Sequence, residues 1–197
     1  MAEVRKAWTT DRASTLATIS DAFATDPVVR WFFPDDSTYQ ARSSAFFGFL
    51  FDVRLAVDGV WVTEDGEAAA LWSPPGAASL EWEERSWDQA AAELAPEEIE
   101  RCDQWDAAVA PHHPDSPHWY LGVLATATAH QGRGLGPAVA QPGIEAAGRA
   151  GLPAFLETGV ERNVALYERM GFVVTGVIDA PGLPNGWCMR RGPDLHG

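Results

Sequence analysis

Hydrophobic residues recur every three or four positions in the first part of the chain. This spacing predicts an amphipathic helix that begins after Asp11 and ends before Pro27. A short aromatic segment follows at residues 28–33, and a longer helix over 39–57 is predicted to turn its phenylalanines toward a core. The opening of the chain is therefore expected to be mainly helical.

Two β-type runs come next. Residues 60–64 and 68–73 are predicted to be strands, and the Asp65–Gly66 pair between them is typical of the tight turn of a β-hairpin. The stretch from Leu80 to Val109 has a helical composition and is rich in carboxylates. We interpret these acidic residues as a solvated helical face, in preference to a ligand site.

The final third of the chain alternates strands with helices. A buried strand at 119–126 leads into a glycine-rich turn and then a helix that continues to about Ala150. The pattern then predicts a strand at 154–158, a short helix at 162–170 and strands at 172–178 and 186–191. A strand, a crossover helix and a second strand form a parallel unit. The sequence therefore predicts a mixed α/β fold, in one domain over residues 1–197.

Composition narrows the possible functions. The chain has 197 residues with 14 basic and 28 acidic side chains, which gives a formal net charge of −14. Nucleic-acid binding and attachment to anionic membranes are disfavoured, because both need clustered Lys and Arg. No apolar run approaches the ~20 residues of a bilayer span, and no secretory leader is recognisable. We expect a cytoplasmic protein.

Neither the cysteines nor the histidines predict a metal site. Cys102 and Cys188 lie far apart and belong to no CxxC pair, so we expect reduced thiols in a core. His112, His113 and Asp115 share one loop, but a metal site would need a further ligand at a defined spacing. The prediction is that the protein holds no metal.

The glycine-rich turn is the strongest chemical signal. The segment Gln131–Gly136 reads QGRGLG between a strand and a helix, and free backbone N–H groups at such a helix start bind anionic phosphate. Pro137 breaks the dinucleotide-binding pattern, and no GK[ST] follows as a P-loop requires. Tight packing of the helix on the strand is the alternative explanation of the glycines.

These residues resemble the acetyl-CoA motif of the GCN5-related N-acetyltransferase (GNAT) family, Q/R-x-x-G-x-G/A. Here the motif is Gln131, Gly134 and Gly136, and it is followed by Asn163 and by the run YERMGF at 167–172. The likeness covers nearly the whole chain and is strongest from about His118 to Thr175. It implies a central, mixed and partly splayed β-sheet flanked by helices, and an enzyme that uses acetyl-CoA as its cosubstrate.

The resemblance also implies which residues bind this cosubstrate. The diphosphate is expected on the turn residues Gln131, Gly132, Arg133, Gly134, Leu135 and Gly136. Arg133 would offset the negative charge of the protein, although a solvated turn residue is its alternative interpretation. The pantetheine arm is expected to pair with the backbone of Leu124, Ala125 and Thr126 and to reach Asn163. The sequence departs from the family at Thr126–Thr128, where a proline-containing step is usual, which puts cofactor affinity in question.

For catalysis, the resemblance implies that Tyr167 protonates the departing thiolate. A phenol of ordinary pKa ~10 carries its proton at neutral pH and can donate it. Glu157, at the end of a predicted strand, is our candidate to bind or deprotonate the incoming amine. Simple core packing of Tyr167 and a backbone hydrogen bond of Glu157 are the alternatives, and His118 and Asp26 are weaker candidates.

The acceptor is expected to be a small molecule with a primary amine. Segments such as PAFLET (153–158) and RNVALYERMGF (162–172) resemble the branch of the family that acetylates puromycin, which suggests an aminonucleoside. An aromatic pocket is expected from Trp31, Phe32, Phe33, Tyr39, Trp72 and Trp119. Acetylation of protein N-termini or lysines, and a non-catalytic CoA-binding regulator, remain alternatives. A monomer and a homodimer are both compatible with the sequence.

Overall fold

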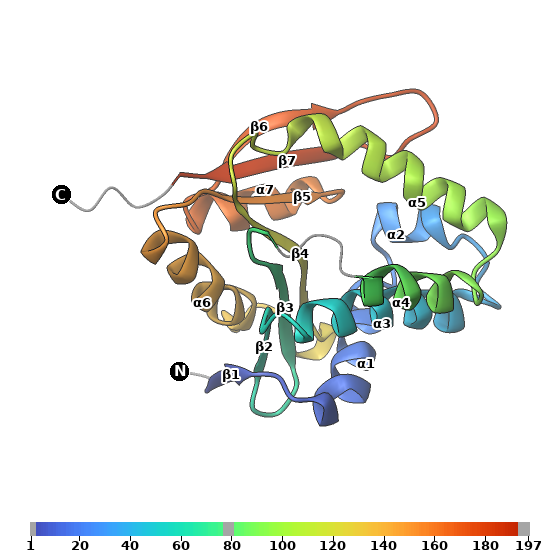
Figure 1. Ribbon diagram of the computed structural model, residues 1–197, viewed down its shortest axis with the longest axis horizontal. Helices are drawn as coiled ribbons and strands as arrows, with labels where there is room; N and C mark the ends of the chain where they lie inside the picture. The colour runs from blue at the N-terminus through green and yellow to red at the C-terminus, as the bar shows by residue number, and fades with distance from the viewer. Residues whose placement is uncertain (1–2, 77–80, 193–197) are drawn as a thin grey trace.

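A computed structural model describes residues 3–76 and 81–192, without the side chains of 81–85. These residues form one seven-stranded sheet of order β1-β2-β3-β4-β5-β7-β6 with helices on both faces (Figure 1). The strands are β1 Val4–Lys6, β2 Val60–Thr63, β3 Ala68–Ser73, β4 Trp119–Thr126, β5 Ala154–Thr158, β6 Val173–Ile178 and β7 Gly186–Arg191. Neighbouring strands are antiparallel except β4 and β5, which are parallel. The predicted mixed α/β class is confirmed.

Seven α-helices and three short 3-10 helices are found in the described residues. The α-helices are α1 Arg12–Ala22, α2 Pro27–Phe32, α3 Tyr39–Leu55, α4 Glu81–Ala91, α5 Pro96–Val109, α6 Leu135–Arg149 and α7 Glu161–Arg169. The 3-10 helices are η1 Thr9–Asp11, η2 Ala110–His112 and η3 Thr128–His130. None of the described helices is both long enough and apolar enough to cross a membrane.

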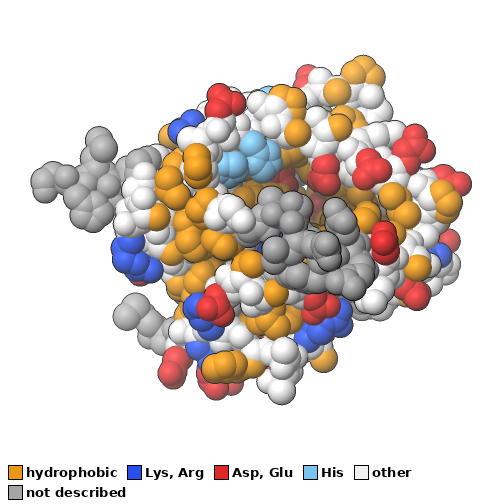
Figure 2. Space-filling model, viewed as in Figure 1, with side chains coloured by type: hydrophobic (Ala, Val, Ile, Leu, Met, Phe, Trp, Pro, Cys, Tyr) orange, Lys and Arg blue, Asp and Glu red, His pale blue; other side chains and the backbone are white. Residues whose placement is uncertain are grey.

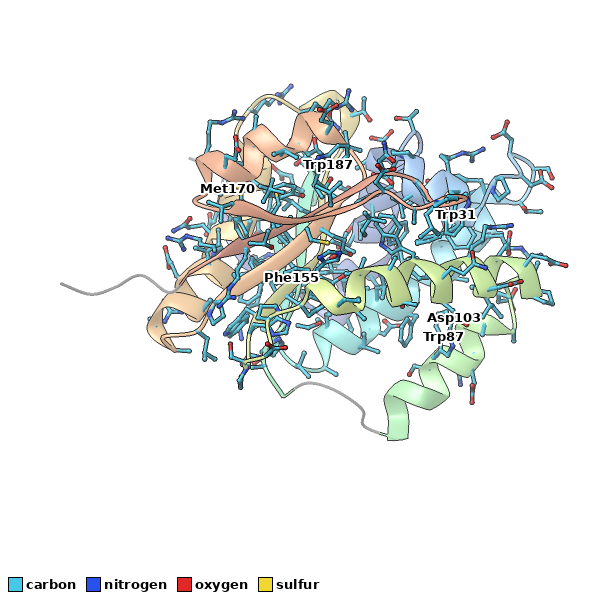
Figure 3. The ribbon with its side chains drawn as sticks, turned by 90° about the horizontal axis from the view of Figure 1, so that it is seen from above. Trp31, Trp87, Asp103, Phe155, Met170 and Trp187 are labelled. Carbon is cyan, nitrogen blue, oxygen red and sulfur yellow. The ribbon has the colours of Figure 1, made fainter. Side chains whose placement is uncertain are left out.

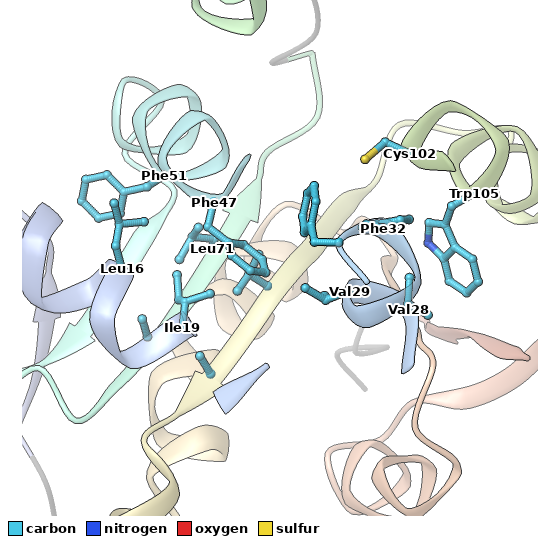
Figure 4. Close-up of a cluster of buried hydrophobic side chains, with 14 of the residues drawn as sticks. Leu16, Ile19, Val28, Val29, Phe32, Phe47, Phe51, Leu71, Cys102 and Trp105 are labelled. Carbon is cyan, nitrogen blue, oxygen red and sulfur yellow. The ribbon is translucent and has the colours of Figure 1, made fainter. Parts of the chain in front are cut away.

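Alternation along the strands divides the core into two layers. Val60 and Val62 of β2 pack with the apolar side chains of α1, α2, α3 and α5 on one face of the sheet, and part of this layer is drawn in Figure 4. Trp61, between them, packs on the opposite face with residues of α6 and α7. Successive residues of a strand point to opposite faces, so a single run of apolar residues supplies both layers.

The sheet is interrupted between β4 and β5. β4 pairs with β3 at positions spread along its length, from Thr126 opposite Ala68 to Tyr120 opposite Ser73. Its pairing with β5 covers only Trp119 and Tyr120, opposite Ala154 and Phe155. Beyond Tyr120 the two strands separate, so the edge of β4 from 121 to 126 has no strand partner on that side. We call this opening the splay.

The structure adds three local details that the sequence pattern left open. The aromatic segment at 28–33 lies largely within helix α2, because Pro27 occupies its first turn and Asp26 caps it by accepting from the N–H groups of Val28 and Val29 at 2.9 and 3.0 Å. The stretch 80–109 is two helices, since α5 begins afresh at Pro96; Leu80 itself lies outside the described residues. Strand β1 was not predicted, because three residues are too few to show a period.

The thiol prediction is confirmed, since Cys102 and Cys188 are free and buried. In the parts of the chain that the structure describes, no group of three His, Cys, Asp or Glu side chains is placed to hold a metal ion. The histidine loop instead forms a packed pair, in which the Nδ1 of His113 lies 2.9 Å from the Nε2 of His118.

Replacement of Gly143 tests the packing of α6 on the sheet. A Cβ at Gly143 would lie 2.3 Å from Cε2 of Trp72, a fully buried ring that has no room to move. We expect Gly143→Ala to lower the free energy of unfolding by about 1–2 kcal/mol, because overpacking outweighs the ~1 kcal/mol gain in helix propensity. Chemical denaturation measures this, with the exposed Gln141→Ala as a control that changes by less than ~0.5 kcal/mol. An unchanged or raised value for Gly143→Ala would contradict the packing.

Candidate functional site

Two cavities meet at the splay. One, of about 510 Å³, adjoins the glycine turn, and we call it the turn cavity. The other, of about 430 Å³, lies among aromatic side chains, and we call it the aromatic cavity. The residues that line both are Phe23, Asp26, Leu124, Asn163 and Tyr167. Together the cavities form the candidate site.

The glycine turn has the backbone geometry of an anion-binding site. Gly132 and Gly134 both have φ of +77°, a conformation that strains other residues. In the described structure the N–H groups from Gly132 to Gly136 donate to no other residue. A Cβ on Gly136 would lie 3.4 Å from the Oγ1 of Thr126, so this glycine also allows close packing on β4. The geometry is therefore compatible with both sequence explanations of the glycines, anion binding and close packing.

Other contacts secure the turn where the sequence departs from the family. The Ala127 N–H donates to the carbonyl of Glu67 at 2.9 Å, and the Thr128 N–H donates to Oδ2 of Asp21 at 2.6 Å. The side chain of Gln131 donates to the carbonyl of Thr126 at 3.2 Å and so closes the turn on the end of β4. A proline is therefore not needed to fix this corner.

The positive charges of the turn cavity differ from those expected. Arg162 and Arg169, both from α7, line it. Arg133 does not; its guanidinium lies 3.4 Å from the carbonyl oxygen of Ala129 and from a ring nitrogen of His130. The cation expected beside the diphosphate was Arg133, inside the motif. The structure places Arg162 and Arg169 at the turn cavity in its stead.

Strand β4 and helix α7 bring the other predicted residues together. Leu124 and Thr126 line the turn cavity, whereas the side chain of Ala125 faces the opposite core. Tyr167 is 7% exposed, and its hydroxyl forms no hydrogen bond with a described residue. Burial raises the pKa of Tyr167, with further contributions from Glu157 and Asp26. The phenol therefore keeps its proton at neutral pH.

Glu157 presents one carboxylate oxygen that no other residue satisfies. Its Oε1 accepts a hydrogen bond of 2.7 Å from the Tyr120 hydroxyl, whereas Oε2 is buried without a partner. Glu157 lines the aromatic cavity, and burial raises its pKa to about 7 against the opposing effect of the Tyr120 bond. A carboxylate with this pKa exchanges a proton near neutrality. The backbone-bonded alternative leaves Oε2 unexplained.

Arg54 lies behind this pair. It is 7% exposed, and its guanidinium is 5.9 Å from the ring centroid of Tyr120. A Cβ at Gly122 would lie 2.5 Å from Nη2 of Arg54, so the glycine leaves the room that the guanidinium occupies. The positive charge of Arg54 lowers the pKa of Glu157 and so favours its ionised form.

The aromatic wall comes mostly from residues that were not predicted. Of the six aromatic residues expected around the acceptor, only Phe32 lines the aromatic cavity. Trp72 and Trp119 pack edge to face on the opposite side of the sheet, with ring centroids 6.4 Å apart. The aromatic residues that do line the cavity are Phe23, Phe32, Phe46, Phe47, Phe49, Trp87, Trp105, Tyr120 and Tyr167. They come from the segment between α1 and α2, from α2–α5, and from β4 and α7, a combination that only the tertiary structure reveals.

The weaker candidates have separate places. His118 lines a third cavity, of about 570 Å³, and not the two that meet at the splay. Asp26 lines both cavities of the site while it caps α2, and burial raises its pKa. Cys102 also lines the aromatic cavity, but burial raises its pKa to about 12, so its thiol is not an activated nucleophile.

Comparison with known proteins agrees with this arrangement. The sequence profile of the Acetyltransferase (GNAT) family matches residues 76–172. The structure of a histone acetyltransferase HPA2 and related acetyltransferase from Corynebacterium glutamicum is similar, with 27% identity, a TM-score of 0.73, and coverage of 99% of this chain and 98% of the other.

Two further structures share the fold at lower identity. Arylalkylamine N-acetyltransferase 2 from Aedes aegypti has 12% identity and a TM-score of 0.66, covering 96% of this chain and 98% of its own. A chain of the NatC complex bound to Gag peptide and CoA has 14% identity and a TM-score of 0.56, covering 96% and 97%. At these identities the likeness concerns the fold alone.

The arginines of the turn cavity can be tested by acetyl-CoA binding. We expect Arg162→Ala and Arg169→Ala each to raise the Kd of acetyl-CoA about fivefold, because a cation beside the phosphates is lost. Arg133→Ala is the matched control and should change the Kd by less than about twofold. Isothermal titration calorimetry measures all three. A larger loss for Arg133→Ala than for the other two would contradict the placement.

Proposed function

We propose that the protein is an acetyltransferase of the GNAT type, as the family match over residues 76–172 supports, and that it uses acetyl-CoA to acetylate a primary amine of a small molecule bound in the aromatic cavity. One observation carries the proposal. The unpartnered Oε2 of Glu157 lies in a cavity that also contains Tyr167, and Tyr167 borders the turn cavity as well. A base and an acid thus flank the region where the two cavities meet.

The turn cavity would hold acetyl-CoA. The free N–H groups from Gly132 to Gly136 suit its diphosphate, at the start of a helix whose dipole favours an anion. The unpaired edge of β4 suits the amide groups of pantetheine, which would add to the sheet like another strand. Asn163 borders both cavities and would contact the same arm. This arrangement would bring the thioester to Tyr167.

The reaction needs two proton movements. The amine must lose a proton before its lone pair forms the new C–N bond, and Glu157 accepts that proton. As the C–S bond breaks, the sulfur takes the electron pair, and Tyr167 donates a proton to the thiolate. No acetylated enzyme is formed, which agrees with the raised pKa of Cys102.

The cavity also favours a class of acceptor. Aromatic side chains and the carboxylates of Asp26 and Glu157 line it together, which suits a cationic amine with an apolar or aromatic body. An aminonucleoside such as puromycin is the first acceptor to test, given the sequence segments that resemble the puromycin-acetylating branch. A peptide amine, which protein acetyltransferases use, needs an open groove.

The function is tested by thiol release from acetyl-CoA. A panel of puromycin, arylalkylamines, polyamines and an N-terminal peptide is incubated with the protein, and released CoA is measured. We expect turnover with at least one small amine and sequential kinetics. Turnover with the peptide alone would show the protein to be a peptide acetyltransferase, and a stable acetylated protein with ping-pong kinetics would exclude direct transfer.

Removal of the Tyr167 hydroxyl separates acid catalysis from packing. Tyr167→Phe keeps the buried ring, so we expect kcat to fall about 100-fold while the Kd of acetyl-CoA and the free energy of unfolding stay nearly unchanged. Tyr39→Phe is the matched control, because Tyr39 is also buried with an unpartnered hydroxyl but lines neither cavity. Equal activities of the two variants would assign Tyr167 to packing alone.

The ionisation of Glu157 predicts how kcat/KM depends on pH. The base is active only when ionised, and its pKa is raised to about 7, so kcat/KM should rise with pH through about 7 and fall below it. Glu157→Gln should remove this ionisation and lower kcat/KM about 100-fold. Tyr120→Phe deletes a hydrogen bond to the carboxylate, so it should move the ionisation to higher pH. A wild-type profile without this limb would refute the role.

A further inference from the structure

Two carboxylates of α5 stand at the mouth of the aromatic cavity. Asp103 and Asp106 line this cavity and are nevertheless exposed to solvent, so they lie at its opening. The acidic residues of this segment were expected to form a solvated face, and the structure gives these two a different place. Figure 2 shows acidic and apolar side chains around a hollow on this face, and Asp103 and Trp87, which both line the cavity, are labelled in Figure 3.

Neither carboxylate has a direct partner among the described residues: Asp103 and Asp106 form no ion pair and no hydrogen bond there. Burial and the neighbouring Asp103 raise the pKa of Asp106 to about 6, and they outweigh the charge of Arg54, which lowers this pKa. The nearest arginine on the same helix, Arg101, donates both of its contacts, at 3.1 and 2.9 Å, to the carbonyl of Phe32. Arg54 is the cation that lines the cavity, and it lies deeper, against Tyr120.

The interior of the same cavity independently indicates a ligand. The Oε2 atom of Glu157 is buried and has no hydrogen-bond partner among the described residues. Buried polar groups without partners are costly in a folded protein and are typically satisfied by a bound molecule. The cavity therefore has one polar end at Glu157 and a second, acidic end at its mouth.

Aromatic rings line the same cavity. Phe49 and Trp87 pack edge to face with centroids 5.2 Å apart, and both line the cavity. Among the described residues, the cavity is lined by the carboxylates of Asp26, Asp103, Asp106 and Glu157 and by the guanidinium of Arg54. A ligand that matches these carboxylates and aromatic rings has a cation at each end of an apolar body.

We propose that the preferred acceptor is a diamine with an apolar or aromatic body, whose reacting amine lies at Glu157 and whose second ammonium is held at the mouth by Asp103 and Asp106. This inference rests on the proposed function, and it names the substrate class. A monoamine would occupy the reacting end and leave the mouth carboxylates to water. The second ammonium group of the diamine is therefore what favours it over a monoamine.

A matched pair of amines tests the proposal. 1,4-Bis(aminomethyl)benzene carries two ammonium groups on one ring, and 4-methylbenzylamine presents the same ring with one. We expect kcat/KM for the diamine to exceed that for the monoamine roughly tenfold, after halving for its two equivalent amines, because two carboxylates attract the second cation. Added salt should reduce this ratio, since the mouth is open to solvent.

Substitutions in α5 test whether Asp103 and Asp106 cause the preference for the diamine. The double variant Asp103→Asn, Asp106→Asn should lower the diamine-to-monoamine ratio to about one to two while the monoamine value changes less than about twofold. Glu100→Gln, on the same helix but outside the cavity, is the control and should keep the ratio. Equal use of both amines by the wild type, or an unchanged ratio in the double variant, would overturn the proposal and leave the proposed function intact.

Binding separates this inference from the function on which it rests. If no small amine releases CoA, the proposed function fails, and calorimetry with the diamine then decides the role of the mouth. A Kd that rises roughly tenfold from wild type to the double variant, with no such rise for the monoamine, supports the diamine site. The same Kd for both proteins refutes it.

Discussion

The functional geometry depends on the early separation of β4 from β5. The two strands pair over only two residues each and then diverge, so a stretch of β4 backbone keeps hydrogen-bonding groups without a strand partner. A sheet normally satisfies such groups internally. Here their exposure is compatible with a stable fold because β3 pairs with β4 along its length and two apolar layers cover the sheet.

The splay also explains why the two cavities are joined. Tyr167 and Asn163 of α7 reach the gap from the β5 side, and Phe23 and Asp26 reach it from the segment between α1 and α2. Asp26 caps α2 at the same time, so the start of that helix is tied to the wall of the site. Segments distant in sequence thus share one short boundary, where the acetyl donor and the amine acceptor can approach each other.

The sequence was informative where the chemistry is local. The turn at Gln131–Gly136 could be predicted because its glycines, the preceding strand and the following helix are contiguous, and Tyr167 belongs to a short recognisable run. The class of fold followed from the order of strands and helices and from the family resemblance. The hairpin at Gly66 was predictable for the same reason, since one dipeptide fixes its geometry.

The acceptor wall was not predictable, because it depends on which face of each helix is buried. Trp72 was expected at the pocket but packs on the opposite face, since alternate residues of β3 enter different layers. Arg162 and Arg169 lie in the run RNVALYERMGF that the sequence analysis quoted, but no role was assigned to them there, and their place beside the turn cavity follows from the direction of α7. The carboxylates of α5 resemble any solvated helical face in sequence, and only the cavity beside them distinguishes Asp103 and Asp106.

The asymmetry of the Glu157 carboxylate has a consequence for repeated turnover. One oxygen is anchored by Tyr120 and the other is bare, so protonation can change without reorientation of the side chain. Because its pKa is about 7, both protonation states are populated in the resting protein at neutral pH. The proton taken up in one cycle can then return to water at little cost in free energy. Burial therefore raises the pKa of Glu157 enough to make it a better base, but not so far that it would stay protonated after the reaction.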